Sequence, residues 1–314
     1  MREREVLDRI RAIFDATQIS TDVAEKIIVG NGDDGAVLQL SQATVFSTDM
    51  SVEGTHFRTD WSSPEEIGRK IAAANLADIC AMGGWPEFLL VSVAFPSQYL
   101  NSLERLAEGI ANEAEKVGAR VIGGDLSQGP ELVISITAIG KTSQPIVRSG
   151  AKVGDVVVVS HLPGYSAAGL LLLNQGNAIE KELEVRAVKA HYAPSLDYLK
   201  YQSAFGQLNS ATDISDGLVV DASHIASASN VAIELDTSML MAQADFGKLQ
   251  TLCGDKYQAL EMVLTGGEDH VLLGTTNSPE KLPGFIEIGR VVAGHGIYVD
   301  GTKRDVETGY QHSW

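Results

Sequence analysis

The sequence predicts a chain of two mixed α/β domains, and three observations support this prediction. The chain has 314 residues, of which 44% are hydrophobic, so it is long enough for more than one core. Segments with the alternating pattern of strands are interspersed with segments that have the spacing of helices. A polar, turn-rich stretch at residues 148–155 separates a strand-rich first half from a new apolar strand at 156–159. We therefore predict domains at residues 1–147 and 148–314.

The first half begins with a predicted helix at residues 4–15, where apolar residues recur at helical spacing. Two short strands follow at residues 36–40 and 44–46. The next helix has clear limits: Ser63 can cap it, Pro64 and Glu66 suit its first turn, and Gly83 ends it. A further helix is predicted at 101–117, then a strand from Arg120 and an alternating strand at 132–138.

The second half continues with a predicted strand at 156–159, a helix that starts between Gly164 and Gly169, and helices around 182–206. The segment from Thr212 to Gly217 precedes a helix whose apolar stripe begins at Leu218. We interpret residues 264–269 as the end of a strand followed by two glycines and two carboxylates. Asp300-Gly301 is typical of a two-residue hairpin turn.

Composition excludes several classes of protein. The net charge of −17, with no concentration of Lys and Arg, argues against binding to nucleic acids or anionic membranes. The two cysteines, Cys80 and Cys253, have neither a disulfide framework nor metal-binding spacing. No apolar run approaches the ~18 residues of a membrane helix, and the charged start is unlike a signal peptide. We expect a cytoplasmic protein.

Two glycine motifs resemble nucleotide fingerprints but lack the required context. Gly30, Gly32 and Gly35 match the dinucleotide pattern, yet a strand follows them where that pattern requires a helix. Gly140-Lys141-Thr142 resembles the end of a P-loop, but Ser135 stands where its first glycine belongs. Neither motif supports a Rossmann or Walker site.

Carboxylates at the ends of predicted elements are the main functional signal. Asp78 lies on the apolar stripe of its helix, where a carboxylate must be paired, protonated or bound to a metal. Asp33 and Asp34 in a glycine-rich turn would repel a bare phosphate but could bind a divalent cation. Each has an ordinary alternative: a buried ion pair for Asp78, a simple turn for Asp33 and Asp34, and helix capping for Asp213 and Asp216. Together with Asp49, Asp125, Glu268 and Asp269, these oxygen ligands favour Mg²⁺ or Ca²⁺, and of the two Mg²⁺ usually accompanies phosphate.

Seven motifs, in order, resemble the thiamine-monophosphate kinase family over nearly the whole chain. They are Gly-Asp-Asp at 32–34, Ser-Thr-Asp with Val-Glu-Gly-Thr-His-Phe within 47–57, Asn-Leu-Ala-Asp with Ala-Met-Gly-Gly within 75–84, Gly-Gly-Asp at 123–125, Arg-Ser-Gly-Ala at 148–151, Asp-Ile-Ser-Asp-Gly-Leu at 213–218 and Thr-Gly-Gly-Glu-Asp at 265–269. The resemblance implies the two-domain fold of the aminoimidazole-ribonucleotide synthetase superfamily. It also implies a homodimer whose N-terminal mixed sheets form a barrel, and transfer of the ATP γ-phosphoryl group to thiamine phosphate with several Mg²⁺ ions.

The resemblance also implies roles for individual residues. The metal ligands would be Asp34, Ser47, Thr48, Asp49, Asp78, Asp125, Asp213 and Asp216, of which Asp49, Asp78 and Asp213 would be catalytic. ATP would contact Gly124, Asp125, Arg148 and Ser215, and thiamine phosphate would contact His56, Glu268 and Trp314. Structural roles remain the alternatives for His56 and for the terminal Trp314.

Four positions depart from the family pattern. Leu126 replaces the usual Thr after Gly-Gly-Asp, Ala77 replaces Ser before Asp78, and His270-Val271 replaces Tyr-Glu after Glu268-Asp269. The alternatives that stay open are another ATP-dependent enzyme of the superfamily, such as one like selenophosphate synthetase, and a catalytically inactive metal-binding homologue. The first would need a reactive cysteine or selenocysteine near the N-terminus, whereas Cys80 is the first cysteine here.

Overall fold

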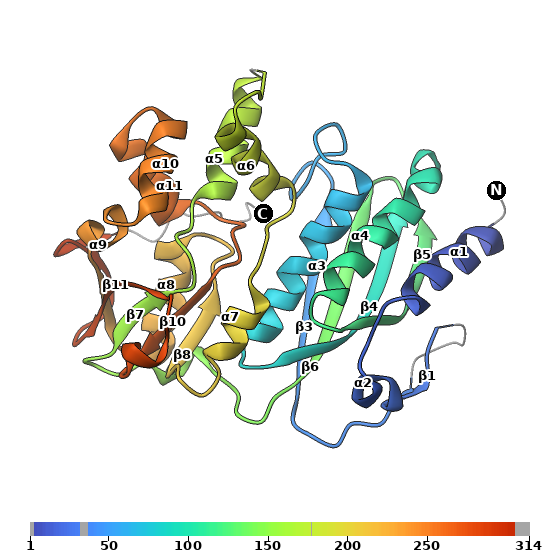
Figure 1. The fold of residues 1–314 in the computed structure, drawn as a ribbon, viewed down its shortest axis with the longest axis horizontal. Coiled ribbons are helices and arrows are strands. Elements are labelled where there is room, and N and C mark those ends of the chain that lie inside the picture. The colour runs from blue at the N-terminus through green and yellow to red at the C-terminus, as the bar shows by residue number, and fades with distance from the viewer. Residues whose placement is uncertain (1–2, 32–36, 177, 305–314) are drawn as a thin grey trace. The chain divides into compact units, whose positions relative to one another are not determined.

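The computed structural model describes residues 3–31, 37–176 and 178–304. Its internal contacts divide the chain into two compact units, one of residues 1–80 with 84–143 and one of residues 144–314 with 81–83. Each unit combines helices with a β-sheet (Figure 1). The predicted α/β class is therefore confirmed.

Unit 1 is built around a four-stranded mixed sheet of order β3-β6-β4-β5, in which only the β4–β5 pair is parallel. Its helices are α1 (Glu3–Asp15), α2 (Thr21–Glu25), α3 (Pro64–Ala81) and α4 (Leu103–Glu115), with the 3-10 helix η1 (Ser97–Ser102) before α4. Its strands are β1 (Ile27–Val29), β2 (Val37–Leu38), β3 (Thr44–Val52), β4 (Trp85–Phe95), β5 (Arg120–Gln128) and β6 (Val133–Lys141).

Helices α3 and α4 cover one face of this sheet, and in Figure 1 they lie in front of it. The predicted capping box starts α3: Ser63 Oγ accepts from the Glu66 N–H at 3.3 Å, and the Ser63 N–H donates to Glu66 Oε2 at 2.8 Å. The helix packs closely on β6, because a Cβ on Gly140 would lie 2.4 Å from Ile79 Cγ2. This packing places α3 next to β3 and β6.

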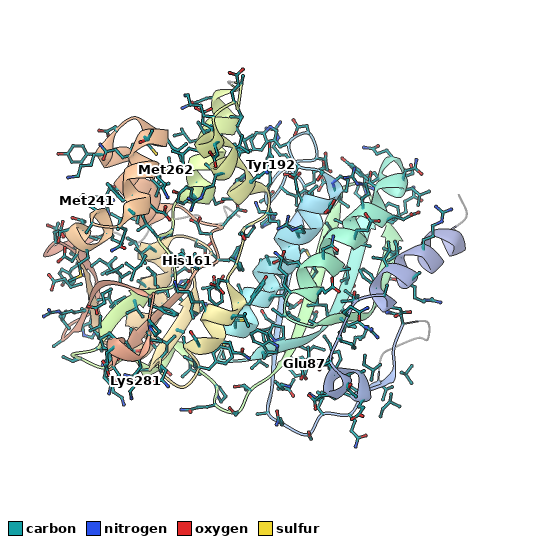
Figure 2. All side chains as sticks on the ribbon, viewed as in Figure 1. Glu87, His161, Tyr192, Met241, Met262 and Lys281 are labelled. Atoms are coloured by element: carbon teal, nitrogen blue, oxygen red, sulfur yellow. The ribbon has the colours of Figure 1, made fainter. Side chains whose placement is uncertain are left out.

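Among the residues that the structure describes, those on the opposite face cover only part of the sheet. Val23 of α2 packs there against Phe88, Ile122 and Ile139. An ion pair also ties this segment to the sheet: buried Glu87, labelled in Figure 2, accepts from Lys26 Nζ at 2.6 Å and from Lys141 Nζ at 2.9 Å. Farther along β3, Phe46 and Met50 are 62% and 61% exposed.

Unit 2 contains a seven-stranded sheet of order β13-β12-β9-β11-β7-β10-β8, antiparallel except for the β12–β9 pair. Its strands are β7 (Val156–Val159), β8 (Ser210–Asp213), β9 (Ala232–Leu235), β10 (Leu272–Thr276), β11 (Ile286–Val292), β12 (Gly296–Val299) and β13 (Thr302–Arg304). Its helices are α5 (Tyr165–Gln175), α6 (Glu182–Tyr192), α7 (Tyr198–Ser203), α8 (Leu218–Ser229), α9 (Thr237–Met241), α10 (Ala244–Cys253) and α11 (Lys256–Thr265), with 3-10 helices η2 (Arg148–Gly150) and η3 (Pro279–Lys281).

Most predicted elements of both units are confirmed, and three interpretations are wrong. Asp49 and Asp125 do not lie at the ends of their strands, because β3 continues to Val52 and β5 continues to Gln128. Leu264 does not end a strand, because it lies in the last turn of α11 with its side chain buried in the core of unit 2. Asp213 does not cap α8, because it is the last residue of β8 and Gly217 is the N-cap. Asp216 does not lie in the first turn of α8, because the helix begins at Leu218. The hairpin at Asp300-Gly301 is confirmed: both residues have positive φ, 49° and 77°, as the predicted two-residue turn requires.

None of the helices within the described residues combines the length and the apolar character that a membrane crossing needs.

Candidate active site

Strand β3 and helix α3 bring three of the predicted residues together in unit 1. Ser47 and Asp49 are two residues apart on β3, so their side chains leave the strand on the same face. Ser47 Oγ donates a hydrogen bond to Oδ2 of Asp78 on α3 at 2.6 Å, which identifies this face as the one that α3 covers. All three residues are only partly buried. They form an accessible group of oxygen atoms.

Thr48 lies between Ser47 and Asp49, and its side chain leaves β3 on the opposite face. Its Oγ1 donates to the carbonyl of Ile136 at 3.1 Å and is 3.0 Å from the hydroxyl of Thr137. The hydroxyl of Thr48 therefore does not join the group formed by Ser47, Asp49 and Asp78.

The Gly-Gly-Asp motif lies on β5, and the strand register decides where its carboxylate points. Asp125 pairs with Ser92 of β4, which pairs with Ser135 of β6 and through it with Met50 of β3. Met50 is two residues from Thr48, so Asp125 and Thr48 share the face that α3 does not cover. The Asp125 carboxylate accepts from Ser127 Oγ at 3.0 Å.

Gly124 is required by the close approach of β4 and β5. A Cβ at this position would lie 1.8 Å from the carbonyl oxygen of Val91, so no larger residue fits without moving the strand. The sheet by itself explains this glycine, and a contact with ATP would be an additional role.

His56 lies in the turn that follows β3. Its Nδ1 accepts a hydrogen bond from the backbone N–H of Val52 at 3.1 Å, so the neutral ring carries its proton on Nε2. Nearby, Glu53 Oε1 accepts from the hydroxyl of Tyr99 at 2.7 Å and from the hydroxyl of Thr59. These contacts hold the turn in place and leave His56 half-buried.

In unit 2, the Asp-Ile-Ser-Asp-Gly motif runs from the end of β8 to the start of α8. Asp213 Oδ2 lies 2.9 Å from Nδ1 of His270, and Ser215 and Asp216 lie on the connection between strand and helix. Asp221, in the first turns of α8, accepts from the backbone N–H groups of this connection. Burial, and after it the charge of Asp213, raises the pKa of Asp221 to about 7.

The Thr-Gly-Gly-Glu-Asp motif lies directly beside this connection. The N–H of Glu268 donates to the carbonyl of Ser215 at 2.8 Å, and the N–H of His270 donates to the carbonyl of Ile214 at 2.8 Å. A Cβ on Gly267 would lie 2.4 Å from the Ser215 oxygen, so the glycine permits this approach. Glu268 and His270 have positive φ values of 63° and 51°. Residues other than glycine rarely adopt such backbone angles, and those that do are concentrated at functional sites.

Asp269 and Glu268 face different partners. Asp269 is buried and accepts from the N–H groups of Gly164, at 2.6 Å, and Ser166, at 3.1 Å, at the start of α5. Burial raises the pKa of Asp269 to about 6, although both N–H groups oppose this shift. Glu268 is partly exposed, and its Oε2 lies 3.4 Å from Nδ1 of His191 on α6. Asp269 therefore anchors the segment, while Glu268 remains accessible.

Arg148 begins η2, and its side chain is attached to the end of the sheet near Asp213. Its Nη2 donates to Thr212 Oγ1 at 3.1 Å, and Ser229 Oγ donates to its backbone carbonyl at 2.7 Å. Both contacts hold the segment of Arg148 against β8 and α8. The positively charged guanidinium of Arg148 thus lies in the same unit as Asp213 and Asp216.

Two predicted site residues, Asp34 and Trp314, lie outside the described residues. Within 3–31, 37–176 and 178–304, no three His, Cys, Asp or Glu side chains lie close enough together to hold a metal by themselves. The donor chemistry still suits Mg²⁺, which keeps several waters and takes one or two carboxylates together with phosphate oxygens. The pairs Asp49 with Asp78 and Asp213 with Asp216 are sets of this kind.

Sequence reasoning missed the roles of three residues next to these motifs. Asp221 follows the motif by only a few residues, and an acid in the first turns of a helix was a usable signal. His270 was recognised only as a departure from the family pattern, although it contacts Asp213. His191 had no local signal, because its position beside Glu268 depends on how α6 packs.

Comparison with known proteins places the chain in a family. The model of the N-terminal domain of AIR synthase related proteins matches residues 32–142, and that of the C-terminal domain matches residues 152–301. The chain is 38% identical over 292 residues to a thiamine-monophosphate kinase of Mycobacterium tuberculosis, covering 91% of this chain and 86% of that protein. The chain belongs to the thiamine-monophosphate kinase family.

Other members of the family agree with this assignment. The thiamine-monophosphate kinase of Aquifex aeolicus is 35% identical over 290 residues, which cover 90% of this chain and 92% of that protein. The crystal structure of the enzyme from Stenotrophomonas maltophilia K279a matches with a TM-score of 0.83 and 30% identity, over 97% of this chain and 98% of that one. A structure of AaThiL in complex with AMPPCP and TMP matches with a TM-score of 0.79 and 32% identity, over 97% of both chains.

Proposed function

We infer that this chain transfers the γ-phosphoryl group of ATP to thiamine monophosphate and thereby forms thiamine diphosphate. Its relatives across most of its length carry the name of this activity, and one solved relative is a complex with AMPPCP and TMP. The observation in this chain that carries the inference is the pair of oxygen-rich groups around Asp78 and Asp213. Phosphoryl transfer needs charge neutralisation and positioning rather than a protein nucleophile, and both groups suit that task.

We propose that the carboxylates and hydroxyls named from the resemblance hold several Mg²⁺ ions. In unit 1 these are Asp34, Ser47, Thr48, Asp49, Asp78 and Asp125, and in unit 2 they are Asp213 and Asp216. Because the Thr48 hydroxyl and Asp125 are on the other face from Asp49 and Asp78, these residues would serve more than one ion. When bound, Mg²⁺ supplies the positive charge that stabilises the transferring phosphoryl group.

For the two substrates, we propose that ATP contacts Gly124, Asp125, Arg148 and Ser215, and that thiamine phosphate contacts His56, Glu268 and Trp314. An oxygen of thiamine phosphate attacks the γ-phosphorus in line, and the bond to the bridging oxygen of ADP breaks. The guanidinium of Arg148 can bind phosphate oxygens, and the Glu268 carboxylate suits the cationic thiazolium ring. A Trp314→Ala variant tests the last contact: it should raise the KM for thiamine phosphate and leave the KM for ATP unchanged.

We also propose a homodimer in which the sheets of unit 1 from two copies meet. The exposed Phe46 and Met50 on the face that α3 leaves open support this proposal. The assignment of residues 1–147 to ATP binding and dimerisation, the role of residues 148–314 as a second α/β domain, and the cytoplasmic location remain predictions.

The decisive experiment combines purified protein with thiamine phosphate, ATP and Mg²⁺ and identifies the products by chromatography. We expect equal amounts of thiamine diphosphate and ADP, and no product without Mg²⁺. The initial rate should continue to rise with free Mg²⁺ at fixed MgATP, because the protein binds ions beyond the one chelated by ATP. Formation of ADP without thiamine diphosphate would contradict the proposed acceptor.

An activity like that of selenophosphate synthetase has little support. The Cys80 side chain is completely buried within α3, and burial raises its pKa far above the ordinary value of a thiol. Burial and the charge of Asp255 also raise the pKa of Cys253. Neither cysteine has the environment of a reactive thiolate.

A further inference from the structure

Asp221 of α8 is 1% exposed and lies next to the proposed phosphate-binding residues. Its Oδ2 accepts three backbone hydrogen bonds, from the N–H of Ser215 at 3.0 Å, of Asp216 at 3.0 Å and of Gly217 at 3.1 Å. These are consecutive residues of the connection between β8 and α8. One carboxylate oxygen thus bonds three successive N–H groups of this turn.

The start of α8 needs such a partner. The first N–H groups of a helix have no partner inside it, and they are normally satisfied by the side chain of the N-cap residue. The N-cap of α8 is Gly217, which has no side chain to offer. Asp221 reaches back from inside the helix and accepts from the N–H of this N-cap residue and from those of the two residues before it, Asp216 and Ser215.

The position of Asp221 is electrostatically unfavourable. Burial disfavours the charged form of Asp221 most, and the charges of Asp213 and Asp216 add to that cost, although the N–H groups of Asp216 and Gly217 oppose it. Contacts that only stabilise the fold do not require a buried acid beside two others. In some proteins, a buried polar or charged group that opposes stability is retained because it fixes a specific arrangement of its neighbours.

The turn that Asp221 holds also contacts the segment of Thr265–Glu268. The carbonyl of Ser215 accepts from the N–H of Glu268, and a Cβ on Gly217 would lie 2.7 Å from the carbonyl of Thr265. A shift of the turn would therefore displace Ser215 and Asp216 first and the Glu268 segment second.

We propose that Asp221 is a positioning residue, which acts through its hydrogen bonds to hold Ser215 and Asp216 in the arrangement that binds MgATP. This proposal deepens the proposed function and rests on it. Asp221 itself would touch neither ATP nor Mg²⁺. Its acceptor oxygen, rather than its charge, would be the property that matters.

Three substitutions of Asp221 distinguish the effect of the position of its acceptor oxygen from the effect of its charge. Asp221→Asn keeps an oxygen at the place of Oδ2. The new amide group can face Nδ1 of His224, which lies 3.7 Å from Oδ1 of Asp221. This nitrogen is buried and has no hydrogen-bond partner among the described residues. Asp221→Glu keeps the charge but displaces the oxygen by one methylene. Asp221→Ala removes the acceptor.

We expect the Ala and Glu variants to raise the KM for MgATP by about 10-fold or more, since the loss of even one such bond can cost that much. The Asn variant should stay within about 3-fold of the parent protein. The KM for thiamine phosphate should change less than that for ATP in every variant.

The matched control is Asp155, another buried acid of unit 2 that is outside the proposed site. It is 3% exposed and accepts from the N–H of Lys152 at 3.0 Å and from Asn209 Nδ2 at 3.0 Å. Asp155→Ala should lower the melting temperature and leave the KM for MgATP unchanged. An Asp221→Ala protein that loses stability in the same way, with an unaltered KM, would overturn the proposal.

Hydrogen–deuterium exchange gives a readout that is independent of turnover. The amides of Ser215, Asp216 and Gly217 should exchange slowly in the parent and Asn variants and rapidly in the Glu variant, which remains informative if Asp221→Ala does not fold. An Asn variant as impaired as the Glu variant would overturn the proposal, because acceptor position would then not be decisive. If the parent protein forms no thiamine diphosphate, the proposed function fails, and the exchange pattern still decides whether Asp221 holds the turn.

Discussion

At the scale of single residues, Asp78 is the proposed metal ligand that connects α3 with β3. Its carboxylate accepts from Ser47 and lies on the same side of the sheet as Asp49. We predict that Asp78→Asn keeps the fold but lowers kcat/KM by on the order of 10²-fold or more, because the amide lacks the charge that cations require. Turnover and thermal melting, each measured with and without Mg²⁺, check this prediction.

The control is Asp60→Asn, the same change at an exposed acid that pairs with Arg58. It should leave both activity and the effect of Mg²⁺ on melting unchanged. If Asp78→Asn raised the melting temperature and kept full activity, Asp78 would be a partly buried charge without a role in metal binding.

A second prediction at this scale concerns Asp269 and pH. Because burial raises its pKa to about 6, the folded protein holds this proton more tightly than the unfolded chain between about pH 4 and pH 6. The contribution of Asp269 to the free energy of unfolding is thus largest below pH 4, falls as the pH rises to 6, and is constant above. The fall is at most about 3 kcal/mol.

Urea denaturation of the parent protein and of Asp269→Asn at several pH values measures this contribution of Asp269 to the free energy of unfolding. The difference between the two free energies of unfolding should shift against the parent protein from pH 4 to pH 6 and then level off. Two curves that stay parallel over this range would show that Asp269 titrates normally in the folded state.

At the scale of elements, glycines set the distance between α3, which carries Asp78, and α4. A Cβ on Gly68 would lie 2.2 Å from the carbonyl of Leu106, and a Cβ on Gly109 would lie 2.1 Å from the carbonyl of Glu65. We predict that Gly68→Ala destabilises the protein by roughly 1–3 kcal/mol, because the helices must separate. Chemical denaturation measures the change.

Gly247 on α10 provides the comparison, because a Cβ there would meet nothing within 4 Å. Gly247→Ala should stabilise the protein by about 0.5–1 kcal/mol, since alanine has the higher helix propensity. Equal effects of the two substitutions would mean that α3 and α4 do not depend on this close contact.

At the scale of the whole molecule, the prediction concerns assembly. If the open face of the unit 1 sheet meets a second copy, Phe46→Glu should place a charge in that interface and shift the mass in solution from two chains to one. Light scattering after size-exclusion chromatography measures it. Leu199→Glu on α7, at a residue that is 70% exposed, should leave the mass unchanged. A parent protein that is already a single chain would contradict the homodimer.

Several elements could be predicted because their signals are local. The capping box at Ser63 and Glu66, the apolar spacing of α1 and α4, and the hairpin at Asp300-Gly301 each depend on residues close in sequence. Leu264 was misread because a short apolar run before two glycines is equally compatible with the end of a strand and with the last turn of a helix.

The sequence by itself determined the two α/β halves, the family and the motifs that carry the carboxylates, since composition, periodicity and short motifs are properties of neighbouring residues. Only the tertiary structure decided how those residues are grouped. It placed Ser47 and Asp49 beside Asp78, turned Thr48 and Asp125 to the other face, and brought His270 to Asp213. Strand register and helix packing connect residues far apart in the chain, and a shift of one residue in register exchanges the two faces of a sheet.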